Sequence, residues 1–180
     1  KKRFNGSQIS DLLHWAEIYI ATKQAIERIF EVLFEHVTNV APPYFDHYEH
    51  IRLELKKYLT KQACFGVRVI NNGIELDGWE VTEDSKRIAF WLVRSLVILC
   101  NALCIKNISI NARDFTNIQM ALKCHLSSVK FDNCSLLFTF DSVRYFNFQC
   151  LINLTHFQFS NSHSCNFISM FNTVPKEKLS

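Results

Sequence analysis

Three short segments of similar pattern recur in the second half of the chain, and they constrain the fold more than any other feature. They are KNISINARD at 106–114, SSVKFDNCS at 127–135 and THFQFSNSH at 155–163, offset by 21 and 28 residues. Each places apolar residues two positions apart with a polar residue between them, which is typical of a strand with one buried face. We therefore predict strands over Cys104 to Ile110, Ser128 to Asp132 and Thr155 to Phe159, joined by short helical or irregular returns.

The three segments resemble leucine-rich repeats of irregular length over residues 105 to 172. In such a repeat the apolar residues fill the core between a strand and its return, and an Asn or Cys then bonds to the backbone of the loop. Cys134 occupies this ladder position in the second segment, Ser162 in the third and Arg113 in the first. The earlier stretch FGVRVI is expected to add a strand to the same sheet, with a helix from Thr82 to about Cys100 as its return.

Residues that alternate with the apolar strand positions are expected to form an exposed, concave face. A polar face of mixed charge suits a protein or peptide partner, although the same residues could simply be solvated. The candidate partner-binding residues are Asn107, Ser109, Asn111, Ser128, Lys130, Asp132, His156, Gln158 and Ser160.

The first third of the chain is predicted to be helical. Apolar residues follow helical spacing from Ser10 to about Val37, and a shorter helix is expected from Asp46 to about Leu59. We divide the chain into a helical or capping region, residues 1–63, and a leucine-rich-repeat-like α/β domain, residues 64–180. The row Phe30, Leu33 and Phe34 is too apolar for a lone helix, so we expect it to offer a contact surface.

Residues 7–30, SQISDLLHWAEIYIATKQAIERIF, resemble the second half of an F-box. The resemblance implies that this region docks on a Skp-type adaptor of a cullin ubiquitin ligase while the repeats hold the substrate. The Leu-Pro half that opens an F-box has no counterpart here. By this resemblance the residues that contact the adaptor are Leu12, Leu13, Trp15 and Ile18.

Composition narrows the classes of function. The chain has 180 residues, 48% of them hydrophobic, which excludes a disordered chain. A net charge of +3 with dispersed basic residues argues against a nucleic acid partner. Seven cysteines lie mostly in apolar runs, which favours a reducing, cytoplasmic or nuclear compartment. The most apolar run, Ile88 to Ile105, contains Arg94, Ser95 and Asn101, so we expect a buried helix rather than a membrane contact.

Enzyme chemistry has little support in the sequence. Glycine-rich phosphate loops, His-Glu-x-x-His and Cys-x-x-Cys are absent. His47 and His50 have the helical spacing of two metal ligands, but zinc sites normally show tighter paired spacing, so surface or hydrogen-bonded histidines are the favoured interpretation. We therefore expect no enzyme, no cofactor and no metal. The predicted function is a protein-interaction module that serves as the substrate-recognition subunit of a cullin-type ubiquitin ligase. The alternative is a structural or regulatory repeat protein that assembles with a paralogue or larger complex, without ubiquitin machinery.

Overall fold

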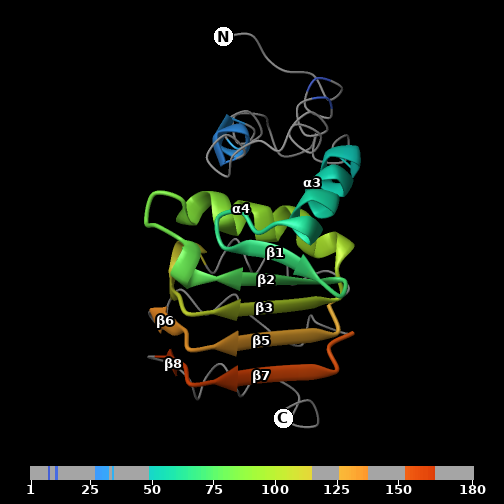
Figure 1. The fold of residues 1–180 in the computed structure, drawn as a ribbon. Helices are drawn as coiled ribbons and strands as arrows, with labels where there is room; N and C mark the ends of the chain where they lie inside the picture. The colour runs from blue at the N-terminus through green and yellow to red at the C-terminus, as the bar shows by residue number, and fades with distance from the viewer. Residues whose placement is uncertain are drawn as a thin grey trace.

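A computed structural model describes residues 8, 11, 27–32, 34, 49–114, 126–137 and 153–164. The protein is a mixed α/β structure with few helices and a five-stranded, mostly parallel sheet (Figure 1). The strand order is β1-β2-β3-β5-β7, and β4-β6-β8 form a second, three-stranded sheet. The elements are α3 (Glu49–Lys61), β1 (Val67–Ile70), β2 (Gly73–Asp77), η2 (Gly78–Glu80), α4 (Lys86–Leu96), η3 (Val97–Leu99), β3 (Ala102–Lys106), β4 (Ser109–Asn111), β5 (Ser128–Asp132), β6 (Ser135–Leu137), β7 (His156–Ser160) and β8 (His163–Ser164).

The sheet begins with an antiparallel hairpin. β1 and β2 pair from Ile70 opposite Gly73, and the two residues between them, Asn71 and Asn72, have φ of 48° and 62°. Two consecutive left-handed residues match the twist of a two-residue hairpin turn, and asparagine tolerates this conformation better than most residues. The predicted strand over FGVRVI is therefore confirmed as β1, which belongs to the same sheet. Its direction differs from the expectation, because β1 runs antiparallel and the strand followed by α4 is β2.

From β2 onward every new strand of the large sheet is parallel to the one before it. An asparagine with positive φ directly follows each of β3, β5 and β7: Asn107 at 58°, Asn133 at 51° and Asn161 at 51°. Each bend leads into a short strand, β4, β6 or β8, and these pair with one another in the second sheet. The left-handed asparagine thus turns the chain from one sheet to the other.

These bends correct the predicted register of the first segment. The predicted strand Cys104 to Ile110 is two strands, β3 and β4, separated at Asn107. Ala102 pairs with Ser128 and Ser128 pairs with His156, so the first offset is 26 residues rather than 21. Arg113 therefore does not correspond to Cys134. The β5 prediction matches the structure, and the β7 prediction is displaced by one residue.

The core lies on one face of the large sheet. The side chains of its strands alternate, so that Leu103, Ile105, Val129, Phe131 and Phe157 are buried while their neighbours are half-buried or exposed. The aromatic rings of Phe131 and Phe157 lie 6.2 Å apart. Helix α4 packs against β1 and β2, with nearly all of its apolar side chains buried.

The helical part of the chain also packs into this core. The predicted helix at 46–59 is observed as α3, and the helix predicted from Thr82 begins later, as α4 followed by η3. Residues 27–32 and 34 are helical; Phe30 is fully buried with its ring 5.6 Å from that of Tyr58, and Phe34 lies 5.7 Å from Trp91. Phe30 and Phe34 therefore complete the core instead of forming the contact surface we expected.

A buried ion pair fixes the start of α4 to the end of β4. Asp114 accepts a hydrogen bond from the backbone of Asn111, whose side chain accepts one from the backbone of Asp114 at 2.9 Å. The ammonium of Lys86 lies 3.2 Å from the Asp114 carboxylate. None of the helices among the described residues is both long and apolar enough to cross a membrane.

Candidate functional site

The open face of the five-stranded sheet carries two rows of side chains that cross the strands. The parallel register places Asp77, Lys106, Asp132 and Ser160 side by side on β2, β3, β5 and β7. A second row lies two residues earlier on β2, β3, β5 and β7 and consists of Glu75, Cys104, Lys130 and Gln158. Arg68 on β1, which pairs with Glu75, extends this row to the edge of the sheet. We call these two rows the open face; they lie on the side of the sheet opposite the core.

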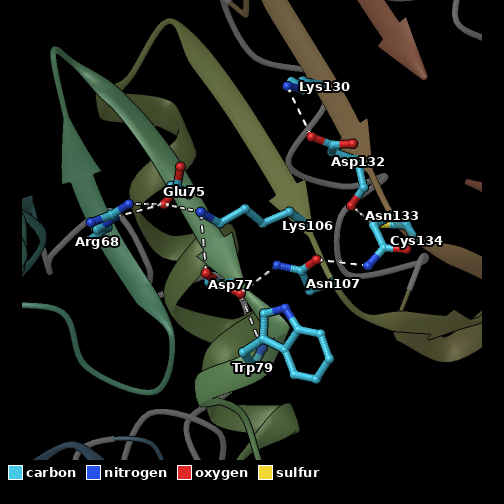
Figure 2. Close-up of polar contacts among 10 residues, drawn as sticks. All are labelled: Arg68, Glu75, Asp77, Trp79, Lys106, Asn107, Lys130, Asp132, Asn133 and Cys134. Atoms are coloured by element: carbon cyan, nitrogen blue, oxygen red, sulfur yellow. Dashed lines mark hydrogen bonds and ion pairs between the residues drawn. The ribbon is translucent and has the colours of Figure 1, made fainter. Parts of the chain in front are cut away.

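Ion pairs fix most of the charges on the open face (Figure 2). Lys106 lies 3.1 Å from Glu75 and 3.2 Å from Asp77, and Glu75 also accepts a 2.7 Å hydrogen bond from Arg68. The contact with Glu75 and then that with Asp77 raise the pKa of Lys106, so its ammonium stays charged. Lys130 forms a separate pair with Asp132 at 3.2 Å. The face is therefore charged but internally balanced.

A ladder of asparagines runs along the carboxyl ends of the strands. The amide of Asn133 donates to the carbonyl of the Asn107 side chain at 2.9 Å, and the amide of Asn107 donates to Asp77 at 3.0 Å (Figure 2). Asn161 donates to Asp132 at 3.3 Å, and Ser160 donates to the same oxygen at 2.9 Å. These left-handed residues thus serve both as bends of the chain and as links between neighbouring strands.

The two aspartates of the open face are held in the ionised form. Partial burial disfavours the charge of Asp77, but hydrogen bonds from Asn107 and from the Trp79 backbone, together with Lys106, outweigh it and lower its pKa. The Ser160 hydroxyl and then Lys130 lower the pKa of Asp132. A carboxylate stabilised in this way is a fixed acceptor and does not act as a general acid near neutral pH.

Cys134 has a structural position directly after Asn133. Its thiol donates to the backbone carbonyl of Ile105 at 3.3 Å, and its backbone N–H donates to the hydroxyl of Ser162 at 2.8 Å. Burial raises the pKa of the Cys134 thiol to about 11, which leaves little of the reactive thiolate at neutral pH. The placement of Cys134 and Ser162 at corresponding positions after β5 and β7 agrees with the expectation from sequence.

The structure brings together six of the nine residues predicted for the concave face. Ser128, Lys130 and Asp132 on β5 lie beside His156, Gln158 and Ser160 on β7. The remaining three are displaced by the bend after β3: Asn107 occupies the bend, and Ser109 and Asn111 lie on β4 in the second sheet. Their prediction as face residues is wrong because the left-handed Asn107 ends the strand before them.

Four charged residues of the open face were missed: Arg68, Glu75, Asp77 and Lys106. Their signal was present, since Glu75 and Asp77 flank the buried Leu76 in the same alternating pattern. The predicted adaptor residues Leu12, Leu13, Trp15 and Ile18 lie outside the described residues. Among residues that the structure does describe, no group of three or more His, Cys, Asp or Glu side chains is placed to hold a metal ion.

Comparison with known proteins gave no matching family model, no similar curated protein and no similar solved structure. The chemistry of the open face is therefore the feature of the described residues that bears on function. That face combines fixed donors, fixed acceptors and balanced charge on the five-stranded sheet.

Proposed function

We propose that this chain is a protein-interaction module that binds a polypeptide partner across the open face of its large sheet. The main support is that ion pairs and the asparagine ladder already fix the side chains of that face before any partner binds. Side chains that are already fixed lose little conformational entropy on binding, which favours specific recognition. In this proposal the open face binds and has no catalytic role.

The balance of charge favours a polypeptide over a polyanion. Three cations, Arg68, Lys106 and Lys130, face three anions, and each cation lies in an ion pair with at least one of them. A protein that binds nucleic acid places a surplus of positive charge against the phosphates, which releases their counterions. The open face has no such surplus. A protein surface of alternating charge can match it pair by pair.

The proposal extends to the role of the partner. Residues 105–172 would act as irregular leucine-rich-repeat-like units that hold a substrate, and the F-box-like residues 7–30 would dock on a Skp-type adaptor. The chain would then be the substrate-recognition subunit of a cullin-type ubiquitin ligase. In the alternative, a paralogue or another complex subunit takes the place of the adaptor.

Affinity purification of the intact protein from its own cells, followed by mass spectrometry, tests both parts. The variant Gln158→Arg with His156→Glu changes the open-face residue Gln158 and an exposed neighbour on the same strand, and Ser109→Ala is a control on the second sheet. We expect the open-face variant to lose the substrate and keep the adaptor, and Leu12→Asp to do the reverse. Partners that are unaffected by the open-face variant would contradict the proposed binding surface.

A further inference from the structure

Three of the five large apolar side chains that are exposed among the described residues lie on segments that meet where the parallel strands begin. Leu53 on α3 is 44% exposed, Ile70 at the end of β1 is 42% exposed, and Ile98 on η3 is 46% exposed. The other two, Trp79 and Leu137, lie on the segments that follow β2 and β5. Exposed apolar residues that gather on one surface mark interaction sites more often than scattered ones do.

The ammonium of Lys56 connects two of these segments to α3. It donates to the side-chain carbonyl of Asn72 at 2.6 Å and to the backbone carbonyl of Leu99 at 2.6 Å. Asn72 lies two residues after Ile70, in the turn between β1 and β2. Leu99 directly follows Ile98 on η3. The two hydrogen bonds therefore bring the β1–β2 turn and η3 to the same lysine.

Leu53 lies on the same side of α3 as Lys56. The two residues are three positions apart in the helix, and side chains at this spacing are neighbours on a helix surface. α3 also packs against β1 and η3, the two elements that carry the other exposed apolar residues. We call the set Leu53, Lys56, Ile70 and Ile98 the Lys56 corner.

The charge at the Lys56 corner is not balanced by a carboxylate of the described part of the chain. A lysine ammonium has three donors, and two of them go to the neutral oxygens of Asn72 and Leu99. Glu54, on the same helix, pairs with Lys57 at 2.7 Å instead. Hydrogen bonds thus fix the ammonium in place and leave its third donor for an acceptor outside these residues. A carboxylate is the acceptor that gives the strongest bond to this cation.

We propose that the Lys56 corner binds an acidic, apolar segment of a protein partner. A glutamate or aspartate of that segment accepts the third hydrogen bond of Lys56, and the apolar residues beside it cover Leu53, Ile70 and Ile98. Burial of the apolar side chains supplies affinity, and the carboxylate selects this segment over a neutral one. The inference goes beyond the proposed function, because no residue of the Lys56 corner belongs to the two rows of the open face.

The test uses the purified full chain and three pools of fluorescein-labelled decapeptides that share random Gly, Ser, Ala and Asn positions around a fixed centre. The centre is Leu-Glu-Leu in the acidic pool, Leu-Gln-Leu in the neutral pool and Ser-Glu-Ser in the polar pool. Fluorescence anisotropy is expected to give about tenfold tighter binding of the acidic pool than of either other pool, since a hydrogen bond between charged groups is worth that much.

Variants of the protein separate the charge from the apolar contacts. Lys56→Met should bind the acidic and neutral pools equally, and Lys56→Arg should keep the preference because it keeps a cation. Leu53→Ser with Ile98→Ser should remove the preference for leucine over serine and keep the preference for glutamate over glutamine. Leu137→Ser, which replaces an exposed leucine on β6, is the matched control and should change neither preference.

Equal binding of the acidic and neutral pools by the unmodified protein would overturn the inference, as would a preference for glutamate that survives in Lys56→Met. Circular dichroism of each variant verifies that α3 is still folded, and Lys56→Arg tests the role of the charge if Lys56→Met is unfolded. Binding to phosphatidylserine vesicles without any preference among the peptide pools would assign the Lys56 corner to a membrane surface and would also contradict it. The proposed function fails separately, when variants of the open face keep every captured partner.

Discussion

The two faces of the large sheet are stabilised by different interactions. The buried face carries close-packed apolar side chains such as Val129 and Phe131, whereas the open face alternates with them and carries Lys130 and Asp132. A change of volume on the buried face leaves a cavity or a clash. A change of charge on the open face is screened by water. Along one strand, residues that stabilise the fold therefore alternate with residues of the proposed binding surface.

The largest effect is expected from Phe131→Ala. Phe131 is fully buried, with the rings of Phe157 and Phe159 each 6.2 Å away, so truncation should cost about 3–5 kcal/mol of unfolding free energy. Lys130→Ala, its neighbour on the other face, should cost less than about 1 kcal/mol. Urea denaturation measures both. Similar costs for the two variants would show that the faces do not differ as described.

Gly78→Ala tests whether the turn at the end of the open face has room for a side chain. A methyl group at this position would meet the carbonyl oxygen of Asn107, so we expect a loss of about 1–3 kcal/mol. Gly73→Ala is the matched control, because a Cβ there would lie 3.1 Å from the Ala102 Cβ, a side chain on the neighbouring strand. If thermal unfolding ranks Gly73→Ala as the worse variant, the turn is looser than the structure indicates.

Asn133→Ala should lower the free energy of unfolding by about 1 kcal/mol, for two reasons. Alanine disfavours a φ of 51°, and it cannot donate to Asn107. Asn133→Gly removes the hydrogen bond but tolerates the conformation, so it should be the less destabilising variant in urea denaturation. A glycine variant as unstable as the alanine variant would assign the cost to the ladder alone.

The smallest effect is expected from Asp77→Asn, and it depends on pH. The folded-state pKa of Asp77 lies below its ordinary value of 3.8, so its stabilisation is present above that value and is lost as pH falls through the folded pKa. The variant cannot titrate there, and its stability should fall less steeply between about pH 5 and pH 3. At pH 7 the cost should be less than about 1 kcal/mol, because Lys106 keeps Glu75. Parallel pH curves of the urea midpoint would contradict this assignment.

Hydrophobic alternation predicted β1, β5 and most of β7, because each of these strands has one buried face. It failed between β3 and β4, where Ile108 continues the apolar spacing although Asn107 bends the chain. Backbone handedness has no signature in hydrophobicity, and asparagine is common in this chain. The open-face residues on β5 and β7 were predicted. Lys106 was missed because the wrong register of β3 assigned other side chains to the surface, and the residues on β1 and β2 were not assigned to the face although they follow the same alternating pattern.

Ion pairing across strands was also beyond the reach of the sequence. Arg68, Glu75 and Lys106 come from three strands, and their contacts require both the hairpin register and the parallel register to be known. The exposure of Trp79 is a further example. Tryptophan is usually largely buried, and its surface position follows from the turn that Gly78 makes against Asn107.

The antiparallel direction of β1 gives the sheet a beginning. Each strand–bend–strand segment after β3 pairs in parallel with the segment before it, whereas β1 lies at the edge of the sheet and runs in the opposite direction. Additional strand–bend–strand segments would therefore fit among the parallel strands but not beyond β1. A designer who wished to lengthen the open face would insert new segments after β3 or β5, and would leave the β1–β2 hairpin unchanged.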